Sequence, residues 1–379
     1  MSTSSRVAAT LTAALFTLAS CSPASTAAPP PAPPLVAFAP QGACAPEDAR
    51  ALYPTENWQS IDPAASGWDD DGVARMLDAA ERGHWVAGMF IHQGRVIARF
   101  GDTSAAYDSR SIRKSIMGAI IGQLVAEQRL SLDATLAALG IDEIEPLSAQ
   151  ERTATLRQLM QSRSGVYRQA AFMTAGDREG MPAPGTHAPG AHYWYNNWDF
   201  NALGTIVRNV AGPLDEVVNE RIARPLGMQD FAPSDVRERF EDLSQHSAYR
   251  IWMSTRDRAR FGYLYLRNGC WAGRQIVPAA FVADSLNPST LRDPSDDFGY
   301  LWRSREGERA YGMTQRWYYA RGNALQYIAL IPEWDVVMVL TTDMDRPGWQ
   351  NWIRRAAGME PDLEDVSAVL VAMNEARPR

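Results

Sequence analysis

Lysine is almost absent from this sequence. Lys114 is the single lysine, and it stands among 37 lysine and arginine residues in a chain of 379. An arginine side chain effectively never loses its proton in a protein, whereas a desolvated lysine amine can do so. Because arginine performs the other cationic tasks of this chain, Lys114 is a candidate for proton transfer. The alternative is that one lysine survived a compositional bias, and the residues around it must decide between the two.

Cysteine and histidine are also scarce, with three and five residues. The spacing of Cys21, Cys44 and Cys270 does not suit a metal site. No two histidines stand at a strong zinc spacing; they are His84, His92, His187, His192 and His246. We therefore expect no metal site. The net charge is −7 and no block of basic residues is present, which argues against a nucleic-acid partner because phosphate binding needs clustered cations.

An apolar run near the N-terminus, Val7 to Ala19, is too short to span a bilayer. It follows one cation, Arg6, and leads into Leu-Ala-Ser-Cys at residues 18–21, which is similar to the lipobox of bacterial lipoproteins. We expect a signal peptide over residues 1–20, lipidation at Cys21 and a Pro/Ala-rich tether over residues 21–45. The protein would then be exported to the bacterial cell envelope or periplasm and would touch the membrane only through this anchor. The alternative is an ordinary secretory signal.

Cys44 and Cys270 would be the remaining thiols of the exported chain. A disulfide between them is allowed in an oxidising compartment. Two separate thiols are the alternative, and the sequence leaves both open.

Two β-hairpins are predicted far apart in the chain. The first joins Val86–Phe90 to Val96–Phe100, and the second joins Gln326–Ile331 to Val336–Thr341. Hairpins so placed favour one antiparallel sheet built from both ends of a domain. The chain between them has several segments of helical pattern, namely Ile116–Glu127, Phe200–Val210, Pro213–Ala223 and Thr255–Arg267.

The predicted fold class is therefore α/β (α+β), with an antiparallel sheet flanked by helices. We expect one domain over residues 46–379, in which the sheet part takes residues 46–105 and 290–379. A mainly helical part over residues 111–285 is inserted, and a cleft lies between the two parts. Residues 165–198 are rich in Gly, Pro, His and aromatics and are too long for a plain connector, so they predict a functional loop.

Ser111 and Lys114 stand three residues apart at the start of the predicted core helix. At this spacing both side chains share one helix face. The helix N-terminus offers backbone N–H groups to an oxyanion, and a neutral lysine amine can take the hydroxyl proton of the serine. Alone, this Ser-x-x-Lys pattern is a weak signal.

Tyr195-Asn196-Asn197 strengthens the signal. A tyrosine beside a lysine can act as base and then protonate a leaving group, and an asparagine amide can hold the lysine head or a substrate amide. The alternative for Tyr195 is a packed aromatic residue among Tyr193, Trp194 and Trp198.

Five segments appear in the order seen in the serine β-lactamase-related family: SIRK at 111–114, LMQSRSG at 159–165, YNNWDFNALG at 195–204, RIARPLGMQDF at 221–231 and ARGNALQYIALIPEWDVVMV at 320–339. The chain resembles this family of class C β-lactamase-like serine hydrolases over roughly residues 50–345, and is most similar to its esterase and 6-aminohexanoate-dimer hydrolase branch. The resemblance implies a β-lactamase/transpeptidase-like fold and hydrolysis through an acyl-enzyme without metal or cofactor. It implies these roles: Ser111 as nucleophile, Lys114 as the adjacent amine, Tyr195 as acid/base, Asn197 as the second-motif asparagine, and the backbone N–H groups of Ser111 and Asn323 as oxyanion hole.

The sequence departs from the family at the third motif, where Ala320-Arg321-Gly322 replaces Lys-Thr-Gly. Ala320 cannot bind a substrate carboxylate, and strand alternation allows Arg321 to point to the opposite face. This disfavours turnover of β-lactams and D-Ala-D-Ala peptides. Ala324 and Leu325 replace paired glycines and are expected to narrow the cleft. Arg113 is expected to face away from Ser111.

The predicted function is that of an exported serine hydrolase that cleaves a small ester or linear amide. Gly322 is a further candidate for substrate binding, and Tyr167 for the wall of an acyl pocket. The aromatic loop with few charges near Tyr195 suggests an apolar or weakly polar substrate. One alternative is a β-lactamase or DD-peptidase type of penicillin-recognising enzyme. Another is a non-catalytic envelope-binding lipoprotein. The sequence does not predict the oligomeric state.

Overall fold

The computed structural model describes residues 34–36, 38, 42–288, 290–293, 296–307, 311–346 and 348–379. Residues Ala32–Arg379 form one compact unit. The predicted signal peptide, the lipidation site Cys21 and most of the tether lie outside the described residues. Within the described ranges, no helix is both long enough and apolar enough to cross a membrane.

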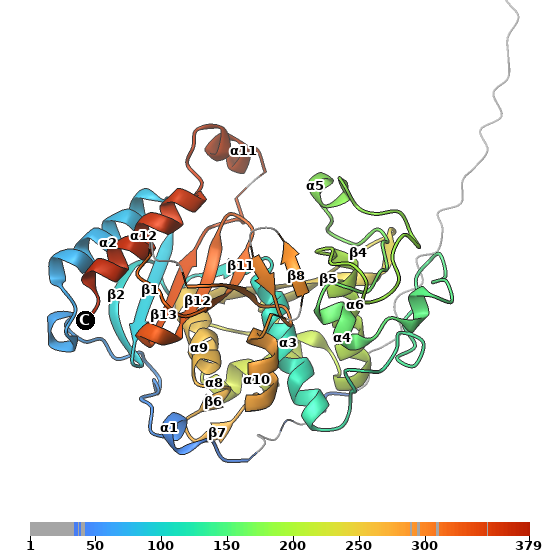
Figure 1. Cartoon of the computed structure of the whole chain (residues 1–379), viewed down its shortest axis with the longest axis horizontal. Coiled ribbons are helices and arrows are strands. Elements are labelled where there is room, and N and C mark those ends of the chain that lie inside the picture. The colour runs from blue at the N-terminus through green and yellow to red at the C-terminus, as the bar shows by residue number, and fades with distance from the viewer. Residues whose placement is uncertain are drawn as a thin grey trace, which may run out of the picture. The chain divides into compact units, whose positions relative to one another are not determined.

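The largest sheet has eight strands in the order β2-β1-β13-β12-β11-β10-β9-β8, and its neighbouring strands are antiparallel (Figure 1). In β1 Ala87 is paired with Thr341 of β13, so strands from the two ends of the domain are neighbours. The bounds are β1 Ala87–His92, β2 Arg95–Gly101, β8 Thr290–Asp293, β9 Asp296–Phe298, β10 Arg303–Arg305, β11 Trp317–Gly322, β12 Gln326–Ile331 and β13 Val336–Thr341. The antiparallel sheet predicted from the two hairpins is confirmed.

The turns of these hairpins have the backbone geometry that antiparallel strands need. Gln93 and Gly94 between β1 and β2 have φ of 51° and 79°, which matches the twist of a two-residue turn. Between β12 and β13, the short helix Pro332–Trp334 is followed by Asp335 with φ of 52°. The β12–β13 pairing keeps one register, whereas the β1–β2 pairing shifts its register once, between Phe90 and Ile91.

Helices cover both faces of the large sheet. On one face α2 (Asp70–Arg82) packs beside α12 (Leu363–Ala376), and on the other α9 (Thr255–Leu266) contacts β1, β12 and β13 (Figure 1). Residues of β13 alternate between two cores: Val337 and Val339 pack with α9, whereas Met338 and Leu340 pack with α2 and α12. This is why β13 reads as a continuous apolar run.

Helix α3 (Ile112–Ala126) joins the sheet to the helical part, and it contacts α6 (Asn197–Ala211), α10 (Ala279–Leu286), β11 and β12. Its isoleucines at 112, 116, 120 and 121 are all fully buried. A helix that carries apolar residues on all its sides is stable only when it is enclosed, which places its first turn at a fixed position beside the sheet.

The helical part contains a sheet that the sequence interpretation missed. Strands β5 (Ser244–Ser254) and β4 (Val236–Glu241) lie within the stretch predicted to be mainly helical, and they form a three-stranded sheet with β3 (Ala106–Asp108), which precedes that stretch. β4 carries mostly charged residues, and its pairing with β5 rather than an apolar alternation defines it as a strand. The remaining elements are α1 Pro46–Ala49, α4 Leu156–Met160, α5 Ala175–Arg178, α7 Leu214–Val218, α8 Arg224–Leu226, α11 Gly348–Ala356, β6 Cys270–Trp271 and β7 Arg274–Gln275.

Cys44 and Cys270 form a disulfide, with their Cα atoms 5.6 Å apart. It attaches the segment at Cys44 to β6, and the neighbouring residue Ala43 pairs with Arg274 of β7. The disulfide closes a sequence separation of 226 residues, so it restrains the unfolded chain over most of its length.

Candidate active site

Ser111 lies at the start of α3, after a turn that Asp108 stabilises. The preceding residue, Arg110, has φ of 49°, a left-handed conformation that is uncommon outside glycine. The Asp108 carboxylate accepts the backbone N–H of Arg110 at 3.0 Å and pairs with the Arg110 guanidinium at 2.9 Å. Backbone strain of this kind costs about 1–3 kcal/mol and persists where the surroundings fix it. The turn places Ser111 as the N-cap of α3 at the wall of a cavity.

The Lys114 amine connects three polar side chains. Its Nζ donates hydrogen bonds to Ser111 Oγ at 3.1 Å, to the Tyr195 hydroxyl oxygen at 2.6 Å and to Asn197 Oδ1 at 3.1 Å. Ser111 precedes Lys114 by one helical turn. Asn197 is the first residue of α6, and Tyr195 lies directly before the N-cap of that helix. The structure thus brings these four residues together.

Burial changes the chemistry of this amine. Lys114 is 3% exposed, and the ring of Phe200 lies 4.0 Å from its Nζ. Desolvation holds the pKa of Lys114 well below its ordinary value, and the positive charges of Arg113 and Arg303 lower it further while Asp177 opposes them. The side chain can therefore be a neutral amine, the form that accepts a proton from a hydroxyl.

Tyr195 is held by the residue that follows it. Asn196 is the N-cap of α6, and its Oδ1 accepts the backbone N–H of Trp198 at 3.1 Å. Its Nδ2 donates to the Val166 backbone oxygen at 2.5 Å and to Asp199 Oδ1 at 3.0 Å. These bonds fix the backbone at Tyr195 to the loop that begins at residue 165.

Asp199 accepts hydrogen bonds that hold the start of this loop in place, and the sequence interpretation missed this residue. It is fully buried, and its Oδ1 accepts the Ser164 hydroxyl at 2.6 Å. The Ser164 oxygen in turn accepts the Val166 N–H at 3.0 Å. Burial raises the pKa of Asp199 well above its ordinary value, and the hydrogen bonds from Ser164 and Asn196 offset this only in part. The signal available in the sequence was an acidic residue between Trp198 and Phe200, in the first turn of a helix.

The hairpin between β11 and β12 lies against the Ser111 turn. A Cβ atom at Gly322 would stand 2.9 Å from the Ser109 backbone oxygen, so only glycine permits this approach. Ala324 and Leu325 have φ of 55° and 50°, the conformation that glycines would adopt without strain. Ser111, Gly322 and Asn323 all line the cavity, which is the arrangement that an oxyanion site made from backbone N–H groups requires.

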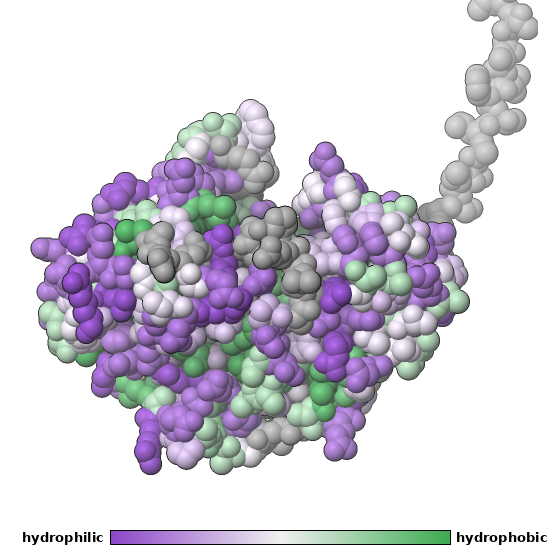
Figure 2. All heavy atoms as spheres, in the orientation of Figure 1, coloured by the Kyte–Doolittle hydropathy of each residue, from purple (hydrophilic) through white to green (hydrophobic). Residues whose placement is uncertain are grey.

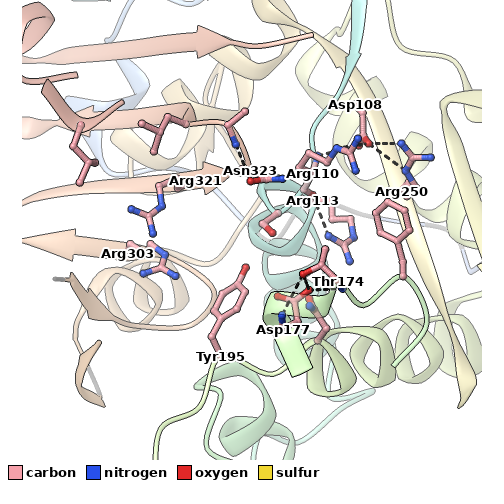
Figure 3. A pocket seen from close by; sticks show the side chains of 17 residues that line it. Asp108, Arg110, Arg113, Thr174, Asp177, Tyr195, Arg250, Arg303, Arg321 and Asn323 are labelled. Atoms are coloured by element: carbon pink, nitrogen blue, oxygen red, sulfur yellow. Dashed lines mark hydrogen bonds and ion pairs between the residues drawn. The ribbon is translucent and has the colours of Figure 1, made fainter. Parts of the chain in front are cut away.

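The cavity has a volume of about 550 Å³. Figure 2 shows the surface hollowed between α11 and α5, and α5 contributes Asp177 to the cavity. Five arginines and two aspartates are among the lining residues, which are Arg110, Arg113, Arg250, Arg303, Arg321, Asp108 and Asp177 (Figure 3). The cavity lining is thus rich in charged side chains, whereas the sequence shows few charges close to Tyr195; the apolar or weakly polar substrate stays a prediction.

Three arginines line the cavity although the sequence interpretation did not place them there. Arg113 lines the cavity although its direction diverges from that of Ser111, because the cavity extends around the first turn of α3. Along β11 the side chains do alternate, but the cavity lies on the side of Arg321, whereas Ala320 is 2% exposed and packs in the core. Arg303 of the neighbouring strand β10, which no local motif predicted, lies beside Arg321 (Figure 3).

Tyr167 is not among the residues that line the cavity. It is 2% exposed, and its hydroxyl forms a hydrogen bond with His187 Nδ1 at 3.0 Å. Burial raises the pKa of Tyr167 to about 12. The predicted role of Tyr167 as an acyl-pocket wall is therefore replaced by a structural one, because its ring is enclosed by the loop that follows residue 165.

In the described part of the chain, no group of three or more His, Cys, Asp or Glu side chains is placed to hold a metal ion.

This fold and site define the class of serine hydrolases with the β-lactamase fold. The family model described as Beta-lactamase matches residues 74–357, well over half of the chain, and the chain belongs to this family. A search of curated proteins found no match.

Solved structures share the fold at low sequence identity. A candidate 6-aminohexanoate-dimer hydrolase from Bacillus anthracis is 18% identical with a TM-score of 0.56, over 82% of this chain and 87% of that chain. A class C β-lactamase is 13% identical with a TM-score of 0.58, over 80% and 95% of the two chains. An octameric penicillin-binding protein homologue from Pyrococcus abyssi is 17% identical with a TM-score of 0.54, over 78% of each chain. At these identities the likeness concerns the fold alone.

Proposed function

We propose that this protein hydrolyses small esters or linear amides through an acyl-enzyme formed at Ser111. The observation that carries the proposal is the position of the buried Lys114 amine, 3.1 Å from Ser111 Oγ and 2.6 Å from the Tyr195 hydroxyl. An amine with a lowered pKa between a hydroxyl nucleophile and a phenol can move a proton from one to the other.

Acylation proceeds through three proton transfers. Ser111 Oγ attacks the carbonyl carbon while its proton passes to Lys114, and the carbonyl electron pair moves onto oxygen. The backbone N–H groups of Ser111 and Asn323 stabilise that oxyanion. The tetrahedral intermediate then collapses, the bond to the leaving group breaks, and Tyr195 gives its proton to the leaving alkoxide or amine. Lys114 restores the proton of Tyr195.

Deacylation reverses these roles. Water attacks the acyl carbon and loses a proton to the Tyr195 and Lys114 pair. The ester bond to Ser111 then breaks, and the pair returns that proton to Ser111 Oγ. The products are a carboxylic acid and free Ser111. Asn197 accepts a hydrogen bond from Lys114 throughout and keeps the amine directed at both hydroxyl groups.

A penicillin-recognising activity is a second candidate because of Arg321. This residue lines the cavity one position after Ala320, where the sequence lacks the third-motif lysine, and it supplies a cation on that wall. Stable acylation of Ser111 by a penicillin would favour this candidate over the esterase or amidase.

We also propose that the protein acts outside the cytoplasm as an anchored lipoprotein. The disulfide between Cys44 and Cys270 supports an oxidising compartment. Incorporation of labelled fatty acid into the wild-type chain but not into Cys21→Ser tests the anchor; equal labelling of the two chains would refute it.

The enzyme is tested by treating the protein from residue 22 onwards with a fluorophosphonate probe and mapping the modified peptide by mass spectrometry. We expect labelling at Ser111 that is lost in Ser111→Ala and strongly slowed in Lys114→Arg, because arginine keeps the charge but not the removable proton. Arg82→Met, an exposed arginine on α2, is the control variant. If the folded protein stays unlabelled, the chain is a non-catalytic binding protein of the envelope.

A further inference from the structure

We propose that a recess beside Arg113 binds a carboxylate on the acyl part of the substrate, so that the enzyme prefers acidic esters or amides to neutral ones. The recess is formed by Arg110, Arg113, Arg250 and Phe172 and is called here the arginine recess. The proposal rests on the proposed function because it names the substrate class of the same site. It concerns a part of the cavity on the far side of α3 from Tyr195 (Figure 3).

Arg113 is a buried cation whose hydrogen-bond donors are only partly paired. It is 6% exposed, and its Nε has no hydrogen-bond partner among the described residues. One terminal nitrogen donates to the Arg110 backbone oxygen at 3.1 Å, and the guanidinium carbon lies 5.0 Å from the centre of the Tyr249 ring. Within the described chain, Arg113 forms no ion pair with a carboxylate. A buried charge without a counter-ion is costly, and a substrate carboxylate would supply the missing charge.

The neighbouring arginines differ from Arg113 because their charges are compensated. Asp108 pairs with Arg110 at 2.9 Å and accepts a bond from Arg250 Nε at 3.2 Å. Asp345 lies 3.7 Å from Arg250. The excess positive charge of the arginine recess is therefore located at Arg113, two residues after Ser111.

Asp177, the other aspartate of the cavity, does not neutralise Arg113. Its Oδ2 accepts the backbone N–H and the hydroxyl of Thr174, both at 2.8 Å, and the described residues include no ion pair between Asp177 and Arg113. The Asp177 carboxylate thus stabilises its own loop at the cavity edge.

The position of the arginine recess assigns it to the acyl part. Tyr195, the proposed proton donor to the leaving group, lies with Arg303 and Arg321 on one side of the start of α3, and Arg113 lies on the other (Figure 3). The Arg303 guanidinium carbon is 5.2 Å from the Tyr195 ring centre. A group that reaches Arg113 from a carbonyl at Ser111 therefore belongs to the acyl chain.

Phe172 provides an apolar wall for that chain. Its ring lies 5.0 Å from the Arg250 guanidinium and 5.5 Å from that of Arg110. Its backbone has φ of 62°, and its N–H donates to Glu241 Oε2 at 3.1 Å, so the loop position is fixed. A short acyl chain with a terminal carboxylate would pack its methylene groups on Phe172 and place its charge at Arg113.

Two esters with the same leaving group test the preference in the wild-type protein. One is para-nitrophenyl hemiglutarate, whose acyl chain ends in a carboxylate, and the other is neutral para-nitrophenyl butyrate. We expect kcat/KM for the hemiglutarate to exceed that for the butyrate by at least about tenfold, the effect of one charge-assisted hydrogen-bond pair. Equal values, or a preference for the butyrate, would overturn the proposal without any mutation.

The variant Arg113→Met tests the residue responsible. We expect the ratio of the two kcat/KM values to fall to about one, while Arg82→Met keeps the wild-type ratio. The ratio is independent of general damage to the catalytic groups, because both esters use the same nucleophile and leaving group. A ratio unchanged in folded Arg113→Met would contradict the proposal.

A binding measurement separates this proposal from the proposed function. Ser111→Ala protein is titrated with monomethyl glutarate and with dimethyl glutarate by calorimetry, and Ser111→Ala/Arg113→Met serves for comparison. Binding of the monomethyl ester that weakens at least about tenfold in the double variant supports the arginine recess even if no ester is hydrolysed. If neutral esters are hydrolysed but the two glutarates bind equally well, the proposed hydrolase activity stands and the proposal that the arginine recess binds a carboxylate is refuted.

Discussion

Lys114 Nζ lies 2.6 Å from the Tyr195 hydroxyl oxygen, a contact that joins α3 to the start of α6 across 81 residues of sequence. The Lys114 side chain is 3% exposed, so bulk solvent contributes little to stabilising a charge on the amine. Proton exchange between the two groups is consequently favoured over exchange with solvent.

Tyr195→Phe tests the assignment of Tyr195 as proton donor to the leaving group. The para-nitrophenolate group leaves without a proton, whereas an alkoxide needs one. We expect kcat/KM to fall by about a hundredfold or more for an alkyl ester and by clearly less for the para-nitrophenyl ester. Steady-state kinetics on both esters provide the measurement, and an equal loss on both would assign Tyr195 to another step.

The pH dependence of hydrolysis should follow the Lys114 amine. Activity requires the neutral amine, so it should rise with pH through a pKa well below that of a free lysine. Arg113 is the first of the neighbouring charges that lower this pKa, after burial itself. In Arg113→Met the pKa of Lys114 should increase, and the acidic limb of the kcat/KM profile should move to higher pH. A limb at the same pH in both proteins would argue against Lys114 as the titrating base.

Asp199→Asn should be tolerated, whereas Asp199→Ala should not. Burial raises the pKa of Asp199 in the folded protein. The contribution of the protonated carboxyl to the free energy of unfolding is therefore fully present at low pH, and it is lost as the pH rises through the folded-state pKa. Asparagine cannot ionise, so the stability of Asp199→Asn relative to wild type should improve from acidic to alkaline pH. Asp199→Ala leaves Ser164 and Asn196 without their acceptor and should cost about 2 kcal/mol or more. Urea unfolding at several pH values checks both, and a constant difference between wild type and Asp199→Asn would refute the assignment.

Gly322→Ala should reduce activity more than it reduces stability. The added methyl group would lie 2.9 Å from the Ser109 oxygen and 3.3 Å from Arg110 Cβ, so the hairpin must move away from the Ser111 turn. A shift of this size changes the distance between the oxyanion donors, and loss of one such donor costs about a hundredfold or more in kcat. Kinetics and thermal unfolding are measured on the same preparation. Wild-type kcat in Gly322→Ala would show that the hairpin does not supply an oxyanion donor.

Local pattern was sufficient for much of the fold. The two hairpins follow from apolar segments around short turns, and α3 follows from an uninterrupted apolar periodicity. The strands β4 and β5 were missed because β4 is mostly charged and is defined by pairing across the chain. Asp199 was missed because its hydrogen bonds run to Ser164, which lies 35 residues away.

The sequence by itself determined the order of the family motifs and the place of the single lysine one helical turn after Ser111. It also determined the apolar character of α3, because of which the helix is buried. Only the tertiary structure decided that Arg113, Arg303 and Arg321 line one cavity. A side chain at the first turn of a helix or at the end of a strand lines a cavity only if segments distant in the sequence form the other walls of that cavity. Here those segments are the loop that carries Phe172 and the hairpin that follows Gly322. Their packing against α3 determines which charged side chains line the cavity.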